Sequence, residues 1–180
     1  MSTRSQIGFY SKEWADKNGK ITKPELDKPD VLIYRHWDGY PAGVLPDIIP
    51  FLVWFSKSRG LHDTEYAGAR LLQYLCNQAD EFVAKEKASD PDNQMFDREY
   101  NKKFTGTLGH GICNDFHLDI EYYYAIDEDK IEVFELTWAK DWEKPEPFSE
   151  RSKKIMTIKF ADLPDEVDED WVKKNIIKEK

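Results

Sequence analysis

Apolar and mostly polar positions alternate strictly along residues 115–126. Every second residue from Phe116 to Ile126 is apolar, and the residues between them run from Asp115 to Ala125. A period of two predicts a strand with one buried and one solvated face. Residues 127–130 then form a turn, and 131–138 are again rich in β-branched and aromatic side chains. The two segments are therefore predicted to form an antiparallel hairpin.

Similar runs of β-branched and aromatic residues predict three more strands, over residues 6–10, 31–37 and 155–160. Apolar residues at helical spacing predict helices over residues 46–57, 65–87 and 168–177. Gly60 is placed to end the first helix, and Asp63 or Thr64 to cap the second. The polar segment 89–103 is predicted to be a surface loop in which function could lie. These elements predict one α+β domain over residues 1–180, with an antiparallel sheet of about five strands against two or three helices.

Composition narrows the classes of partner and compartment. Hydrophobic residues make up 40% of the 180 positions, which is enough for a core, and the net charge of −9 makes this an acidic protein. That charge repels nucleic-acid backbones and anionic lipid, so we expect neither double-stranded nucleic acid nor a membrane as partner. The start of the chain lacks the apolar stretch of a secretory signal, and Cys76 lies in a helical pattern, so we expect free thiols in a cytoplasmic protein.

A segment dense in reactive and binding side chains follows the second predicted strand, from Tyr34 to Pro41. Asp38 is followed by Gly39, a turn signal in which the glycine can take a positive φ. The predicted ligand-binding residues are two arginines for anionic groups, two aromatic residues for stacking and two polar turn residues: Arg4, Arg35, Trp37, Tyr40, His36 and Asp38. In the alternative interpretation, the aromatic residues fill a core edge and the polar ones hydrogen-bond the turn.

Three motifs resemble a family of uncharacterised proteins that is frequent in phages, prophages and other mobile elements. They are Thr3-Arg4-Ser5-Gln6-Ile7, the turn from His36 to Pro41, and Glu121-Tyr122-Tyr123-Tyr124 followed by the hairpin over residues 127–137. Residues 61–109 match no pattern of that family. The resemblance implies a viral or mobile-element context, which places the protein in the cytoplasm of a host cell. It implies no catalytic activity.

A second cluster of candidate ligands lies on the predicted strand 115–126. His117, Asp119 and Glu121 share its polar face, and His36 with Asp38, or His110, could complete a site for zinc or manganese. The metal set of this interpretation is His36, Asp38, His117 and Asp119, where a divalent transition metal would activate water for phosphodiester hydrolysis. Alternatively, this polar face is only the solvated side of the sheet.

The leading hypothesis is a binding module without catalytic activity and without a cofactor. Its partner would be a small anionic, nucleotide-like ligand or a host protein, engaged by the turn that follows the second strand. The first alternative is the metal-dependent hydrolase. The second is a structural or interaction domain that has no ligand site.

Overall fold

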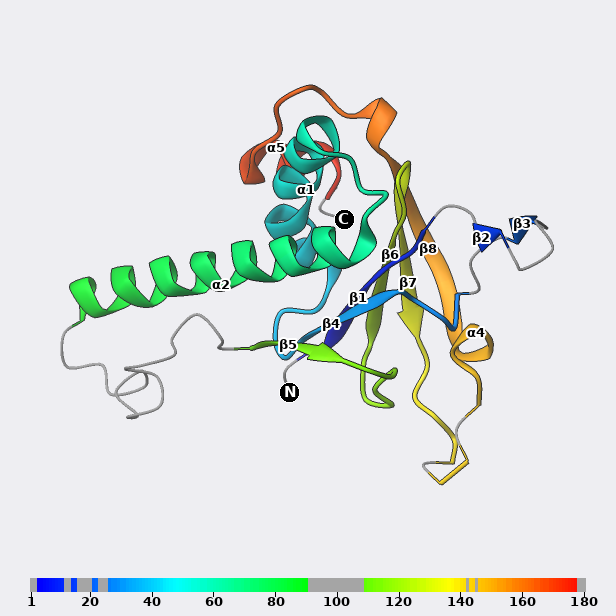
Figure 1. The fold of residues 1–180 in the computed structure, drawn as a ribbon. Helices are drawn as coiled ribbons and strands as arrows, with labels where there is room; N and C mark the ends of the chain where they lie inside the picture. The colour runs from blue at the N-terminus through cyan, green and yellow to red at the C-terminus, as the bar shows by residue number, and fades with distance from the viewer. Residues whose placement is uncertain are drawn as a thin grey trace.

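The computed structural model describes residues 3–11, 14–15, 21–22, 26–90, 109–141, 143–144 and 146–177. Figure 1 shows the arrangement of the elements along the chain. The strands are β1 (Ser5–Phe9), β2 (Trp14–Ala15), β3 (Ile21–Thr22), β4 (Val31–Arg35), β5 (His110–Cys113), β6 (Tyr122–Ile126), β7 (Lys130–Leu136) and β8 (Ser152–Lys159). The helices are α1 (Pro41–Ser58), α2 (Thr64–Ser89), α4 (Phe148–Arg151), the short 3-10 helix η3 (Phe160–Asp162) and α5 (Glu169–Asn175).

The main sheet has six strands in the order β5-β4-β1-β6-β7-β8, and β2 pairs with β3 separately. The predicted α+β class is confirmed, but the sheet is mixed, because β1 and β6 run parallel while the other neighbours are antiparallel. After β4 the chain passes through both long helices and through β5, which pairs antiparallel with β4, before β6 aligns parallel to β1. The predicted hairpin is confirmed as β6 and β7. β5 was missed, since four residues that include a glycine carry no alternating pattern.

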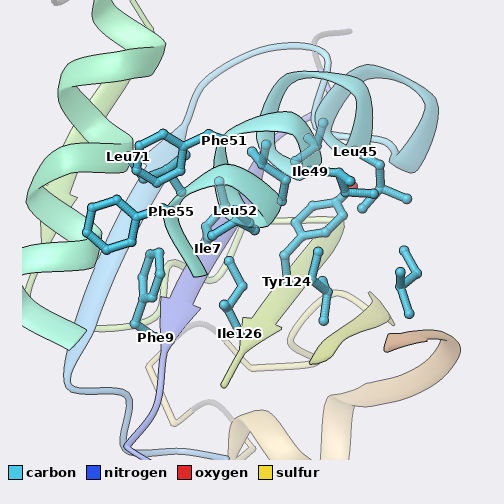
Figure 2. Packing of buried hydrophobic residues seen from close by; sticks show 14 of the residues in the cluster. Ile7, Phe9, Leu45, Ile49, Phe51, Leu52, Phe55, Leu71, Tyr124 and Ile126 are labelled. Atoms are coloured by element: carbon cyan, nitrogen blue, oxygen red, sulfur yellow. The ribbon is translucent and has the colours of Figure 1, made fainter. Parts of the chain in front are cut away.

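Helices cover one face of this sheet, and most of the buried apolar side chains lie between them and it. Ile7 and Phe9 of β1 lie beneath α1, beside Tyr124 and Ile126 of β6, while Leu71 reaches in from α2 (Figure 2). Burying such side chains contributes roughly 1.5–3 kcal/mol each. The helix face of the sheet is therefore the main source of stability.

The helix boundaries follow local signals that the sequence shows. α1 begins at Pro41 rather than at residue 46, because a proline fits the first position of a helix, where its missing N–H has no partner to lose. Gly60 ends α1 with a φ of +87°, as predicted. Asp63 caps α2 by accepting the backbone N–H of Tyr66 at 3.1 Å, which settles the choice of cap. The predicted C-terminal helix is confirmed as α5.

The opposite face of the sheet is also covered, which corrects the prediction of a solvated face for residues 115–126. Strand β6 begins only at Tyr122, and residues 114–121 form a loop with Phe116 and Ile120 packed against the sheet. Tyr123 is fully buried, because Phe116 and Phe148 lie against its ring. The polar residues of the predicted strand therefore do not share one face.

Three further expectations concern individual segments. Cys76 and Cys113 are free thiols. The predicted surface loop over residues 89–103 falls outside the described residues from position 91 onward. Among the helices that the structure describes, none combines the length and the apolar character needed to cross a bilayer.

Candidate functional site

Three segments that are distant in sequence meet at one end of the sheet. The backbone N–H of Gly39 donates to the carbonyl of Thr3 at 3.0 Å, and that of Glu121 donates to the carbonyl of Arg4 at 2.9 Å. The hydroxyl of Tyr124 completes the junction by donating to the carbonyl of Gly39 at 2.8 Å. Residues 3–4, the turn at Gly39 and the start of β6 therefore form one structural unit.

The turn between β4 and α1 owes its shape to two neighbouring residues. Asp38 takes the positive φ, 51°, which corrects the expectation that Gly39 would do so. Aspartate tolerates this region of φ/ψ space better than most residues do. Gly39 is needed for space instead, because a Cβ there would lie 2.7 Å from the carbonyl carbon of Arg4 and 2.8 Å from the amide nitrogen of Ser5. The turn is thereby pressed against the start of β1.

Arg35 braces this turn from the helix side of the sheet. Its buried guanidinium pairs with Asp47 of α1 at 2.5 Å and donates from Nε to the carbonyl of Trp37 at 2.9 Å. Burial raises the pKa of the Asp47 carboxyl, and the charge of Arg35 offsets part of that rise. Arg35 therefore lies on the face opposite to Tyr34 and holds the turn against α1.

Four aromatic or imidazole side chains gather on the other side of β4, and they are called the aromatic strip below: Tyr34, His36, Trp37 and His117. The Tyr34 ring centroid lies 4.6 Å from that of His117 and 6.0 Å from that of His36. The Tyr34 hydroxyl lies 3.1 Å from Nδ1 of His36, whose ring is 5.8 Å from that of Trp37. His36, Trp37 and His117 are exposed and Tyr34 is half-buried, so the strip is a surface feature.

A buried glutamine holds His117 at the strip. The side-chain Oε1 of Gln6 accepts the backbone N–H of His117 at 3.0 Å, and its Nε2 donates to the carbonyl of Asp115 at 3.1 Å. Gln6 is fully buried, so both ends of its amide need these partners. The loop that carries His117 is thus fixed to β1.

Trp37 is held over a glycine. Gly109 has a φ of +77°, and a Cβ there would lie 2.6 Å from Cζ2 of the Trp37 indole. The carbonyl of Gly109 also accepts the backbone N–H of His36 at 2.8 Å. The indole therefore has a defined position although 40% of its surface is exposed.

Arg4 lies beside the strip, already paired with a carboxylate. Its guanidinium forms an ion pair with Asp119, and both side chains are partly exposed. Burial raises the pKa of Tyr34, and the nearby positive charge of Arg4 counteracts part of that rise. Arg151 also holds this loop, because its guanidinium donates to the carbonyl of Leu118 at 3.3 Å.

The predicted metal ligands do not converge. His117, Asp119 and Glu121 lie in the loop that precedes β6, and Asp119 is engaged by an arginine. Within the part of the chain that the structure describes, histidine, cysteine and carboxylate side chains form no group of three that could hold a metal ion. His36 lies in the strip, whereas Asp38 lies in the turn that precedes α1.

The structure thus brings together part of the predicted ligand-binding set. Arg4, His36 and Trp37 lie at or beside the strip, Arg35 lies on the other face, and Tyr40 has no ring contact with the strip among the described residues. No family model, curated protein or solved structure matches this chain.

Proposed function

We propose that this protein is a protein-binding module whose contact surface is the aromatic strip. The observation that carries the proposal is the continuous series of ring contacts from His117 through Tyr34 and His36 to Trp37. Aromatic side chains that are exposed yet held in place offer contact area at a low cost in conformational entropy, and they are enriched where proteins bind. Fixed rings of this kind suit the centre of an interface.

A polypeptide partner suits this surface better than a small anionic ligand. Arg35 is buried on the other face with Asp47, and Arg4 is paired with Asp119. The Asp119 carboxylate already neutralises the charge of Arg4, which leaves that arginine a weaker site for an anion. A host protein is therefore the proposed class of partner, and a nucleotide-like ligand becomes an outcome of the test.

The proposal includes a cellular context, the cytoplasm of a host cell that carries a phage or another mobile element. The resemblance of the three motifs to a family from mobile elements is what supports it. Two free thiols are in keeping with a reducing compartment.

The test is selection of a displayed library of random peptides against the full chain, followed by Kd measurements on the Trp37→Ala and His117→Ala variants. Selected peptides should bind either variant at least about tenfold more weakly, because each substitution removes part of one ring surface. Trp54→Ala is the matched control, because Trp54 is a tryptophan of α1 with 63% of its surface exposed. It should leave the Kd unchanged.

The opposite results would remove the proposal. Peptides whose Kd responds to Trp54→Ala but to neither strip variant would place binding elsewhere on the molecule. If no peptide is selected and adenosine monophosphate shifts the NMR resonances of the strip, the small-ligand hypothesis would replace it.

A further inference from the structure

The two edges of the main sheet differ in how well they are protected. Edge strand β8 carries Lys153, Lys154 and Lys159, and its pairing with β7 has a register shift at Val133 and Phe134. Lysines and irregular pairing are devices that keep edge strands from pairing with other chains. Edge strand β5 has the sequence His-Gly-Ile-Cys, with neither a lysine nor a proline. Among the described residues, no strand pairs with its outer side.

The backbone of Ile112 points outward from this edge. In the ladder between β4 and β5, Tyr34 lies opposite Gly111. The hydrogen bond from the His36 N–H to the Gly109 carbonyl shows which of the opposing residue pairs are hydrogen-bonded to each other. In an antiparallel ladder, alternate residues bond inward, so Gly111 bonds to β4 and the N–H and C=O of Ile112 face away from it. Among the described residues, this donor and this acceptor therefore have no strand partner at the sheet edge.

The side chains of β5 leave room for a second strand. Ile112 is 71% exposed, the largest exposed fraction among the large apolar residues that the structure describes. A Cβ on Gly111 would meet no atom within 4 Å, so no described residue crowds the other face of β5 at this position. Together with the outward backbone groups, these features make a surface that a β-strand would complete.

We infer that β5 pairs with β5 of a second copy of this chain. An antiparallel pair centred on Ile112 places the two isoleucines directly opposite each other, so each covers the other's exposed surface. The same symmetry matches the N–H of each Ile112 with the C=O of the other. β5 carries no charged Asp, Glu, Lys or Arg, so like charges within the strand do not oppose this contact.

This pairing goes beyond the proposed function and has a consequence for it. A two-fold axis perpendicular to the sheet places the same face of both copies on the same side of the joined sheet. The aromatic strips of both copies therefore lie on one face of the dimer. The two β4 strands would be separated by the two β5 strands, about 14 Å at three strand spacings. The dimer would thus present two copies of the aromatic strip and could bind a partner bivalently.

The first test is sedimentation velocity of the full chain between about 10 µM and about 1 mM, a range that detects weak association. The parent should associate reversibly. Ile112→Pro should stay monomeric because it lacks the outward N–H, and Ile112→Ala, which keeps that N–H, should associate more weakly than the parent. The control Ile155→Ala removes an isoleucine that is 42% exposed on the guarded edge, and it should associate like the parent.

A second test needs no proline. With Cys76 and Cys113 changed to serine, Ile112→Cys should form a disulfide-linked dimer on mild oxidation, because Cα atoms of a hydrogen-bonded antiparallel pair lie about 5.5 Å apart. Ile155→Cys in the same background should crosslink at least about tenfold more slowly, since its edge is guarded.

A parent that remains monomeric throughout the concentration range overturns the inference, as does equal crosslinking of the two cysteine variants. A folded Ile112→Pro that associates like the parent would also overturn it, and if that variant does not fold, the crosslinking comparison decides. Failure here leaves the proposed function standing, because Trp37→Ala tests the strip alone and should not change the association.

Discussion

Gly8 shows, at the scale of single residues, how closely the second face of the sheet is packed. A Cβ on Gly8 would overlap the hydroxyl of Tyr123 and lie 2.7 Å from its Cζ. Tyr123 cannot move aside, because it is fully buried and its hydroxyl is hydrogen-bonded to that of Tyr10. Glycine is therefore required at position 8 for space.

Gly8→Ala is expected to lower the free energy of unfolding by about 3 kcal/mol, the upper range for forcing extra volume into a packed core. Urea denaturation measures this directly. Gly111→Ala is the matched control, a strand glycine with open space around it, and it should change stability by less than about 0.5 kcal/mol. Equal effects of the two substitutions would mean that the packing described for Gly8 is wrong.

The sequence alone could have predicted which residues lie on which face of β4. Alternate residues of a strand point to opposite faces, so Arg35 shares a face with Ile33, which packs in the core on the helix side. Tyr34 and His36 belong to the other face. Period-two reasoning could therefore have separated Arg35 from the strip. The contribution of Gln6 could not have been found this way, because its partners lie more than a hundred residues away and depend on the parallel pairing of β1.

At the scale of elements, β7 and β8 are joined by a small charged network on the sheet surface. The Glu132 carboxylate lies 2.9 Å from Nζ of Lys154 and 3.1 Å from Nζ of Lys130. Partial burial by itself would raise the pKa of Glu132, but the hydrogen bonds and charges of the two lysines outweigh it and lower the pKa below 4.5. The ionised form is thus favoured in the folded state.

Because this pKa is lowered on folding, its contribution to stability is present above pH 4.5 and is lost as the pH falls through the folded-state value. Glu132→Gln should therefore be less stable than the parent by about 0.5–1 kcal/mol at neutral pH, a range typical of surface ion pairs. The difference should shrink toward zero in strong acid. Urea denaturation of Glu132→Gln and of the parent, at neutral pH and in strong acid, checks this. A difference in the free energy of unfolding that does not change with pH would contradict it.

The elements with local signals were predictable, and those that depend on distant partners were not. Both long helices and the hairpin of β6 and β7 follow from periodicity and capping residues close in sequence. The first half of the predicted strand 115–126 failed because Phe116 and Ile120 alternate like strand residues yet pack as loop anchors. The order of strands and the parallel pair follow from tertiary packing, which periodicity does not encode.

At the scale of the whole molecule, the two sides of β4 differ: one carries a buried ion pair and the other carries exposed rings. On the helix side, Arg35 with Asp47 holds the turn against α1. On the other side, His36 and His117 are exposed members of the aromatic strip. Arg35 braces the junction, and under the proposed function other residues of the same junction, the exposed rings of the strip, would bind the partner. This separation is the central claim about this protein.

The most direct test of that claim compares the free energy of unfolding of Arg35→Ala with that of the double variant His36→Ala and His117→Ala. Arg35→Ala should lose about 3 kcal/mol, because it removes a buried guanidinium and leaves the half-buried Asp47 carboxylate and the carbonyl of Trp37 without their partner. The double variant should stay within about 0.5 kcal/mol of the parent, as surface substitutions usually do. A double variant destabilised as much as Arg35→Ala would show that the strip supports the fold, and the claim would be wrong.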